Sequence, residues 1–324
     1  MEILLQFILL IVGFALLIKG ADIFVDASVN IAKILKIPSI IIGLTIVALG
    51  TSLPEAVVSV SAALSGSTDI AVGNVVGSNL FNLLIVLGLS ALVAPLAVHF
   101  NEISKDTWLS IVATVVLLVM TILFVAEIPR WGGIIFFAGF IVYIFVVVRS
   151  ALKNRISSSE NVENAENPED SAKNKPMLNS IIFTIIGIAL IIVGGQLTVI
   201  NAVAIAYAFD ISERIVGLTI VAMGTSLPEL VTSIVACTKG ENDIAIGNVV
   251  GSNIFNILFV LGLTGMVMPL AINPSLVLDL GVLIASSLLF LLFAYTGKKI
   301  VRLEGAALVL VYAIYMVVII FVQP

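Results

Sequence analysis

The chain has 324 residues, of which 60% are hydrophobic and 11% charged, and its mean hydropathy is +1.25. These values exclude an ordinary soluble globular domain. Its only cysteine, Cys237, and its only histidine, His99, exclude an intrachain disulfide, a His- or Cys-based zinc site and Ser-His or Cys-His catalysis. The net charge of −5 carries little information, because several acids gather in one polar loop. We expect the lipid bilayer, and no nucleic acid, as a partner.

Apolar runs long enough to cross a hydrocarbon core of ~30 Å recur along the chain. They predict an all-α polytopic membrane protein. The first and sixth runs are longer than the bilayer is thick, so we expect those helices to be strongly tilted. The sequence predicts ten transmembrane helices, at residues 3–30, 38–64, 70–93, 107–126, 130–149, 178–206, 214–237, 243–268, 276–296 and 301–322.

A polar, acidic stretch at residues 150–176 divides these helices into two groups of five. Its composition, poor in bulky apolar residues, predicts a disordered linker between one repeat at 1–149 and a second at 177–324. A unit with an odd number of spans enters the membrane in opposite directions in its two copies. The two repeats are therefore expected to be inverted about an axis in the membrane plane.

Basic residues predict the orientation of the chain, because Lys and Arg accumulate in cytoplasmic loops. If the N-terminus lies outside, only Arg130 and Arg214 fall in outer loops, and Lys19 lies within the first span. We therefore expect a multi-pass protein of the cell membrane with both termini outside and a cytoplasmic linker. The inner basic residues are then Lys33, Lys36, Lys105, Arg149, Lys153, Arg155, Lys173, Lys175, Lys239, Lys298, Lys299 and Arg302.

One block of sequence occurs twice. Residues 43–89 align without a gap with residues 217–263, and most positions are identical. Gly-Leu-Thr-Ile-Val-Ala-x-Gly-Thr-Ser-Leu-Pro-Glu begins each copy, and Gly-Asn-Val-Val-Gly-Ser-Asn-x-Phe-Asn follows in each. A repeated polar motif inside a repeated membrane scaffold is typical of secondary transporters.

Each copy contains a proline in the middle of a predicted span, Pro54 and Pro228. Proline lacks a backbone donor and clashes with the carbonyl four residues back, which here belongs to Gly50 or Gly224. We expect Gly-Thr-Ser-Leu-Pro to break each helix and to release carbonyls towards a cavity. The neighbouring hydroxyls are hard oxygen donors of the kind that Na⁺ and Ca²⁺ prefer, and belong to Thr51, Ser52, Thr225 and Ser226.

Glu55 and Glu229 follow these prolines. A carboxylate at the bilayer centre costs about 2.5–3.5 kcal/mol on insertion scales, and no basic residue lies in the four core segments to offset it. A bound cation is the natural counter-charge, and two carboxylates balance one Ca²⁺. Asn82 and Asn256 are expected to complete a ring of oxygens. The Gly-x-x-x-Gly spacing beside Ser78 and Ser252 is more often a packing face, although those hydroxyls add oxygen donors.

With these residues, the chain resembles the two alpha-repeats of the sodium/calcium exchangers, in the cation/calcium exchanger superfamily, and specifically the compact prokaryotic members. The resemblance implies that Glu55, Glu229, Asn82 and Asn256 form the central ring, with the glutamates as the principal Ca²⁺ ligands. It also implies Na⁺ contacts from the Ala48 and Ala222 carbonyls and sliding of the first and sixth helices against the core. The surrounding sodium-site oxygens would belong to Thr51, Ser52, Ser78, Thr225, Ser226 and Ser252.

The predicted function is therefore electrogenic antiport of Na⁺ against Ca²⁺ by alternating access, not enzymatic catalysis, with the transported ions in place of a cofactor. Potassium-dependent relatives typically carry Asp where this chain has Asn256, so K⁺ independence is favoured. A Ca²⁺/H⁺ antiporter is the closest alternative, although its usual Gly-Asn-x-x-Glu pattern is absent. A cation channel and an intramembrane hydrolase are weaker alternatives. The oligomeric state is left open.

Overall fold

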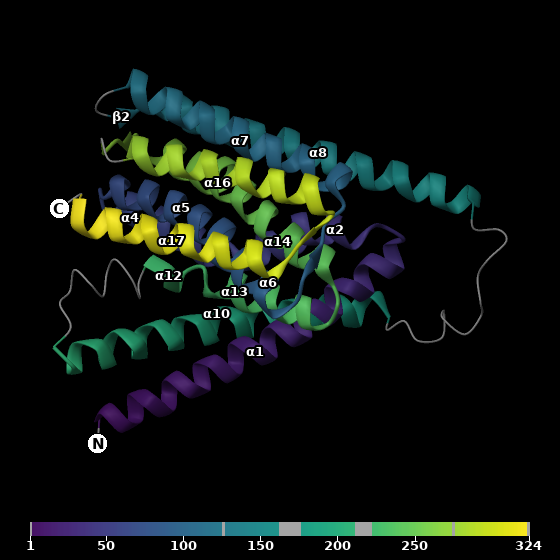
Figure 1. Ribbon diagram of the computed structural model, residues 1–324, viewed down its shortest axis with the longest axis horizontal. Coiled ribbons are helices and arrows are strands. Elements are labelled where there is room, and N and C mark those ends of the chain that lie inside the picture. Colours follow the sequence, from purple (N-terminus) through teal and green to yellow (C-terminus); the bar gives the residue numbers. More distant parts are fainter. Residues whose placement is uncertain (1, 125–126, 162–175, 211–221, 274–275, 323–324) are drawn as a thin grey trace.

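The computed structural model describes residues 2–124, 127–161, 176–210, 222–273 and 276–322, which form helices and four two-residue strands joined by short turns (Figure 1). Within this part of the chain, eight helices are long and apolar enough to cross a membrane, or nine if one bent pair counts as a single span. The predicted seventh span, 214–237, begins outside the described residues. Its described part ends in the short apolar helix α13, Leu227–Thr238.

From the helix break onward, the described elements follow one another in the same order in both halves. Those of the first half are α1 (Glu2–Leu35), α2 (Ser39–Ile42), η1 (Gly43–Val47), α3 (Ala48–Thr51), α4 (Leu53–Leu64), α5 (Thr68–Phe81), η2 (Asn82–Val86), α6 (Leu87–Val93), β1 (Leu96–Ala97), α7 (Phe100–Leu123), β2 (Glu127–Ile128) and α8 (Arg130–Asn161). Those of the second half are α10 (Met177–Ala208), α12 (Ala222–Gly224), α13, α14 (Asn242–Ile254), η4 (Phe255–Leu261), α15 (Gly262–Val267), β3 (Leu270–Ala271), α16 (Leu276–Gly297), β4 (Lys299–Ile300) and α17 (Arg302–Val322).

The predicted boundary between the first repeat and the linker differs from the structure. Helix α8 continues past residue 149 to Asn161, so its last turns occupy the start of the predicted linker. The polar composition of this stretch suggested disorder, but helix propagation from a long apolar segment costs less than starting a new helix. Most of the remaining linker, residues 162–175, lies outside the described residues.

Helices α1 and α10 form a pair along one edge of the molecule, while α7 and α8 lie at the opposite edge (Figure 1). A Cβ on Gly13 would lie 2.8 Å from the Thr198 backbone nitrogen, and one on Gly20 would lie 2.9 Å from that of Ile191. The later residue on α1, Gly20, meets the earlier residue on α10, Ile191, so the two helices run antiparallel. Only glycine permits this approach, as in other small-residue helix contacts in membranes.

The centre of the molecule is the span formed by α14, η4 and α15, together with α5, η2 and α6. In the most hydrophobic stretch of the α14 span 94% of residues are buried, against 17% for α1. A Cβ on Gly247 would lie 2.8 Å from the Ile40 carbonyl oxygen and 2.9 Å from Gly43 Cα. Helix α14 therefore crosses the α2–η1 segment at backbone contact, which confirms the expected packing role for the second copy of the glycine motif. At Gly73 and Gly77 in the first copy, no described atom lies within 4 Å of an added Cβ.

The four short strands join the halves of the chain to each other. β1 pairs antiparallel with β4, with Leu96 opposite Ile300, and β2 pairs antiparallel with β3, with Ile128 opposite Leu270. Each pairing therefore takes one strand from each half. The pairs fix the helix ends around the buried centre.

Candidate ion-binding site

Both repeated motifs break a helix where the proline was expected to break it. Helix α3 ends at Thr51, Ser52 has φ −82° and ψ 4°, and α4 begins at Leu53 after a bend of 45°. In the second half, Ser226 has φ −91° and ψ 6° and α13 begins at Leu227. Each glutamate thus lies in the first turn of a new helix, where unpaired backbone N–H groups favour a negative charge.

The two glutamates are fully buried and are held by the opposite half of the chain. Ser52 Oγ donates to Glu229 Oε1 at 3.1 Å, and Ser226 Oγ donates to Glu55 Oε1 at 3.0 Å. Both carboxylates are 0% exposed and close enough for their charges to interact. The predicted Ser and Glu residues of the two motifs therefore come together in one site.

Several buried oxygens in this region accept or donate no hydrogen bond within the described part of the chain. They include the second oxygens of both glutamates and the amide oxygens of both predicted asparagines, Glu55 Oε2, Glu229 Oε2, Asn82 Oδ1 and Asn256 Oδ1, together with Ser78 Oγ. Leaving a buried polar atom unpaired costs about 1–3 kcal/mol. Oxygens on equivalent residues of both repeats are therefore available to a ligand that supplies positive charge.

Four asparagines form a two-fold network at the centre. Asn79 Nδ2 donates to the Asn253 carbonyl at 3.1 Å, and Asn253 Nδ2 donates to the Asn79 carbonyl at 3.3 Å. The amide nitrogens of the predicted ligands Asn82 and Asn256 donate to Asn253 Oδ1 at 3.2 Å and Asn79 Oδ1 at 3.0 Å. Their own amide oxygens are thereby turned away from this network.

Asn79 and Asn253 are not among the predicted site residues, although both lie in the repeated Gly-Asn-Val-Val-Gly-Ser-Asn phrase. Their equal spacing in the two copies was the available signal. The predicted asparagines of this network lie in π-helical stretches, Asn82 in η2 and Asn256 in η4. A π-helical turn inside an α-helix is frequently found at a functional site.

A further layer of polar residues surrounds the predicted hydroxyls. Thr51 Oγ1 donates to Asn248 Oδ1 at 3.0 Å, and the Asn248 amide in turn donates to Ser233 Oγ at 3.0 Å. In the other half, Thr225 Oγ1 donates to Asn74 Oδ1 at 3.3 Å, and the Asn74 amide donates to Ser59 Oγ at 3.1 Å. Asn74, Asn248, Ser59 and Ser233 were not predicted, but they orient two hydroxyls that were.

The remaining predicted residues lie around the same centre. Thr51 and Ser252 are close to the Glu229 carboxylate, and the Thr51 hydroxyl lies 3.5 Å from that of Ser252. The Ala48 carbonyl accepts the Ser52 backbone N–H at 3.0 Å. Ala222 begins α12, the short helix that precedes the second break.

The site contains only two acids. No group of three or more His, Cys, Asp or Glu residues converges within the described part of the chain. The formal charge at the centre is therefore set by Glu55 and Glu229, and its other oxygens belong to neutral amides, hydroxyls and carbonyls. Such a set suits hard cations that take oxygen ligands and does not suit zinc or other metals that prefer N and S.

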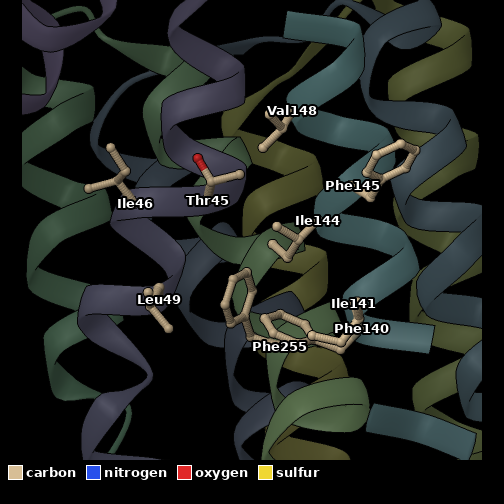
Figure 2. Close-up of a pocket in the computed structure, with 9 residues that line it drawn as sticks. All are labelled: Thr45, Ile46, Leu49, Phe140, Ile141, Ile144, Phe145, Val148 and Phe255. Carbon is tan, nitrogen blue, oxygen red and sulfur yellow. The ribbon is translucent and has the colours of Figure 1, made fainter. Parts of the chain in front are cut away.

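A cavity of ≈ 540 Å³ lies elsewhere, between the η1 segment and α8 (Figure 2). Its lining is apolar except for Thr45, whose hydroxyl donates to the Ile41 carbonyl at 2.6 Å. Phe145 and Val148 on its rim are exposed, so this groove faces the surroundings of the protein. None of its lining residues is a predicted ion ligand.

A family model described as sodium/calcium exchanger protein matches residues 5–149 and 179–321. "Sodium/calcium exchanger MaX1" of Methanosarcina acetivorans is 34% identical over 346 residues, covering 98% of this chain and 99% of that relative. "Putative antiporter CaxA" of Alkalimonas amylolytica is 39% identical over 314 residues, covering 95% and 96%. These proteins are exchangers or antiporters, not enzymes.

A solved structure of the sodium-calcium exchanger NCX_Mj, soaked with 2.5 mM Na⁺ and 10 mM Sr²⁺, matches with a TM-score of 0.82 and 32% identity. The match covers 97% of this chain and 99% of that one. That structure is described in terms of extracellular ion exchange and induced binding-site occlusion. The fold is thus that of a compact prokaryotic exchanger.

Proposed function

The chain belongs to the sodium/calcium exchanger family, and from this premise we propose that it is a secondary active antiporter that exchanges Na⁺ for Ca²⁺ by alternating access. The observation that carries the proposal is the pair of buried carboxylates, Glu55 and Glu229, each with one oxygen unpaired in the described structure. Their two negative charges balance one Ca²⁺. Asn82 and Asn256 supply neutral oxygens beside them.

In this proposal several Na⁺ ions and one Ca²⁺ compete for overlapping oxygens. Ca²⁺ needs the full charge of both glutamates to replace its water shell. Na⁺ ions bind at the flanking hydroxyls and backbone carbonyls, raise the local positive charge and expel Ca²⁺. The sodium ligands proposed are Ala48, Thr51, Ser52, Ser78, Ala222, Thr225, Ser226 and Ser252, and no resident cofactor takes part.

We also propose ten spans arranged as two inverted five-helix repeats, with both termini outside and the linker in the cytoplasm. The antiparallel contact of α1 with α10, which occupy equivalent places in the two halves, supports inversion. The crossed bonds from Ser52 to Glu229 and from Ser226 to Glu55 support it independently. Inverted repeats give a carrier two related conformations that open to opposite sides.

Exchange of more Na⁺ charge than Ca²⁺ charge makes the cycle electrogenic, at about 2.3 kcal/mol per net charge for each 100 mV. A neutral Asn256 in place of an acid supports K⁺ independence. The membrane potential should therefore change the rate of exchange, and K⁺ should not.

The test is ⁴⁵Ca²⁺ uptake into proteoliposomes loaded with Na⁺, compared with vesicles loaded with choline at the same pH. Uptake that requires the outward Na⁺ gradient supports the proposal. Uptake that ignores Na⁺ and follows an imposed pH gradient would instead support the alternative, a Ca²⁺/H⁺ antiporter on the same fold. Uptake that continues without any counter-ion would contradict both and indicate a channel.

A further inference from the structure

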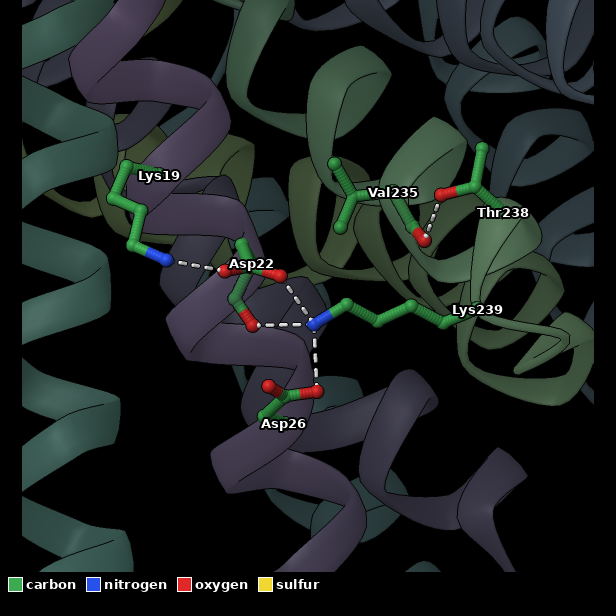
Figure 3. A network of polar contacts seen from close by, with 6 residues as sticks. All are labelled: Lys19, Asp22, Asp26, Val235, Thr238 and Lys239. Carbon is green, nitrogen blue, oxygen red and sulfur yellow. Dashed lines mark hydrogen bonds and ion pairs between the residues drawn. The ribbon is translucent and has the colours of Figure 1, made fainter.

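A charged network joins the peripheral helix α1 to the end of α13 (Figure 3). Lys239 Nζ lies 2.6 Å from Asp22 Oδ1 and 2.6 Å from Asp26 Oδ1, and it donates to the Asp22 backbone carbonyl at 2.9 Å. Lys19 adds an ion pair to Asp22 at 2.7 Å. One ammonium group thus contacts α1 at three points over one helical turn.

The network is partly exposed, since the Asp26 side chain is 61% exposed and that of Lys19 is 67% exposed. The Lys239 side chain is 25% exposed and that of Asp22 is 36% exposed. Burial acts to lower the pKa of Lys239, but the hydrogen bonds from its ammonium group to Asp22 and Asp26 outweigh this and raise the pKa above its usual value. The lysine therefore stays charged at physiological pH.

The repeat gives this network no counterpart in the other half of the chain. The motifs are offset by 174 residues, the separation of Asn79 and Asn253. At the same offset Lys239 corresponds to Ser65, Asp22 to Gln196 and Asp26 to Ile200. The glycines of the α1–α10 contact keep this offset, since Gly20 corresponds to Gly194, so the comparison of the two helices is in register.

The central site, in contrast, is nearly symmetric. The bonds Ser52–Glu229 and Ser226–Glu55 are matched to 0.1 Å, at 3.1 and 3.0 Å. The four asparagines also bond reciprocally. A symmetric site cannot by itself favour one side of the membrane, so any preference must come from groups that the repeat does not copy.

The network connects α13, which carries Glu229, to α1. A preference for one side of the membrane would have to change how these two helices pack. The helix α13 carries Glu229 at its first turn and ends at Thr238, directly before Lys239. Helix α1 contacts α13, but in its most hydrophobic stretch only 17% of residues are buried, and its closest backbone contacts are with α10. Beside the network α1 is buried, with Phe24 and Val25 0% exposed, so the α1–α10 pair can move only by sliding this apolar face along the core. Apolar contacts can be exchanged during sliding, whereas the ion pairs of Lys239 are broken by it.

We propose that Lys239, Asp22 and Asp26 form a one-sided ionic latch that holds the α1–α10 pair against α13 and favours the conformation closed at that end. The inference deepens the proposed function, because it concerns regulation of the same glutamate site. In the proposed orientation the latch lies at the cytoplasmic end, so it favours the state in which ions exchange with the outside. Opening the cytoplasmic end separates the lysine from both aspartates.

The size of the expected shift between the two conformations follows from the two ion pairs of Lys239, which solvent partly screens. Exposed pairs contribute up to about a factor of five each, and partly buried ones more, so loss of the latch should shift the equilibrium between the two conformations by about three- to thirtyfold. A conformation populated at about 1% would then rise to as much as about a fifth of the molecules. High salt should produce part of the same shift in the wild-type protein.

The first experiment measures conformation without transport. Nitroxide labels at Ile11 on α1 and Leu292 on α16, both exposed, are placed in a Cys237→Ala background, and their distance distribution is measured by pulsed electron resonance. Lys239→Met should add a second distance population. The matched control is Ser65→Met at the corresponding position of the other repeat, which should leave the distribution unchanged.

A second variant guards against simple destabilisation by the two unpaired acids. The triple variant Lys239→Met, Asp22→Asn, Asp26→Asn removes every charge of the latch and should show the same second population. Installing the mirror latch, with Ser65→Lys and Gln196→Asp, should reduce that population in the Lys239→Met protein. Distributions identical to wild type in both the single and triple variants would overturn the latch.

The second experiment measures sidedness in oriented vesicles. The ratio of the apparent Ca²⁺ affinities at the two faces should move by about three- to thirtyfold in Lys239→Met and stay constant in Ser65→Met. If wild-type vesicles show no Na⁺-dependent uptake while the distances still shift, the proposed function fails and the latch stands. If wild-type exchange is normal and neither distances nor ratio move, the latch fails alone.

Discussion

Replacing either buried glutamate by glutamine tests the site with almost no change of shape. Glu55→Gln removes one of two negative charges and keeps the side-chain volume and the acceptor for Ser226 Oγ, which bonds Glu55 Oε1 at 3.0 Å. Glu229→Gln does the same for the bond from Ser52 Oγ at 3.1 Å. The change is therefore mainly one of charge.

The size of the effect follows from burial. Both side chains are 0% exposed, so water does not screen the lost charge. Removing one partner of a buried charge pair costs about 3–5 kcal/mol. That cost corresponds to a loss of about a hundred- to several-thousandfold in Ca²⁺ affinity. The near two-fold symmetry of the contacts predicts losses of similar size at the two positions.

The assay is equilibrium ⁴⁵Ca²⁺ binding to purified protein, followed by uptake into Na⁺-loaded vesicles. Glu102→Gln is the control, because Glu102 is an exposed acid near the start of α7 and should leave both measurements unchanged. Near-normal Ca²⁺ affinity in either Glu55→Gln or Glu229→Gln would refute the assignment of these carboxylates as the Ca²⁺ ligands.

Three further predictions concern packing and coupling. Asn79→Ala and Asn253→Ala should each lower the thermal midpoint in detergent by a similar amount, because each leaves buried amides unpaired at about 1–3 kcal/mol per group; a loss in one alone would contradict the two-fold network. Gly247→Val should reduce the yield of folded protein, since its Cβ would meet the Ile40 carbonyl at 2.8 Å, whereas Gly281→Ala, with open space at its Cβ among the described atoms, should be neutral. An inside-negative potential should alter the initial rate of Na⁺-driven uptake, and removal of K⁺ should not; insensitivity to voltage would exclude an electrogenic cycle.

The helix breaks and the burial of the two glutamates could be predicted from the sequence, because polar residues are costly inside a membrane and these occur twice. Pro54 and Pro228 predict the helix breaks, and the structure confirms them at Ser52 and Ser226. The burial of both glutamates follows in the same way, because a charge in a hydrophobic segment must face the interior.

The residues that hydrogen-bond to the predicted ligands are harder to predict. Asn79 and Asn253 occur in both copies of the motif, like the predicted asparagines. Their hydrogen bonds, however, join two residues that lie 174 positions apart in the sequence. Periodicity reports which face of a helix is buried and says nothing about which helix lies opposite. The cross-chain partners of Thr51 and Thr225 depend on the same information.

The latch could not be predicted from the sequence, because its residues are not repeated in the other half. Lys19, Asp22 and Asp26 have no repeated equivalents, and on one helix they resemble the polar edge of a tilted span. Their partner, Lys239, follows α13 far along the chain, and only the packing of α1 on α13 brings the charges together. Helix boundaries show a similar limit, since α8 continues to Asn161 through a stretch whose composition favours a linker.

The most direct test of the central claim is simultaneous measurement of ²²Na⁺ efflux and ⁴⁵Ca²⁺ uptake in the same proteoliposomes, at equal pH on both sides. The account predicts that each flux stops when the other ion is withdrawn, that more than two Na⁺ leave for each Ca²⁺ that enters, and that Glu229→Gln abolishes both fluxes. Ca²⁺ uptake without Na⁺ efflux, or Na⁺ efflux that continues in the absence of external Ca²⁺, would contradict exchange at the shared glutamate site.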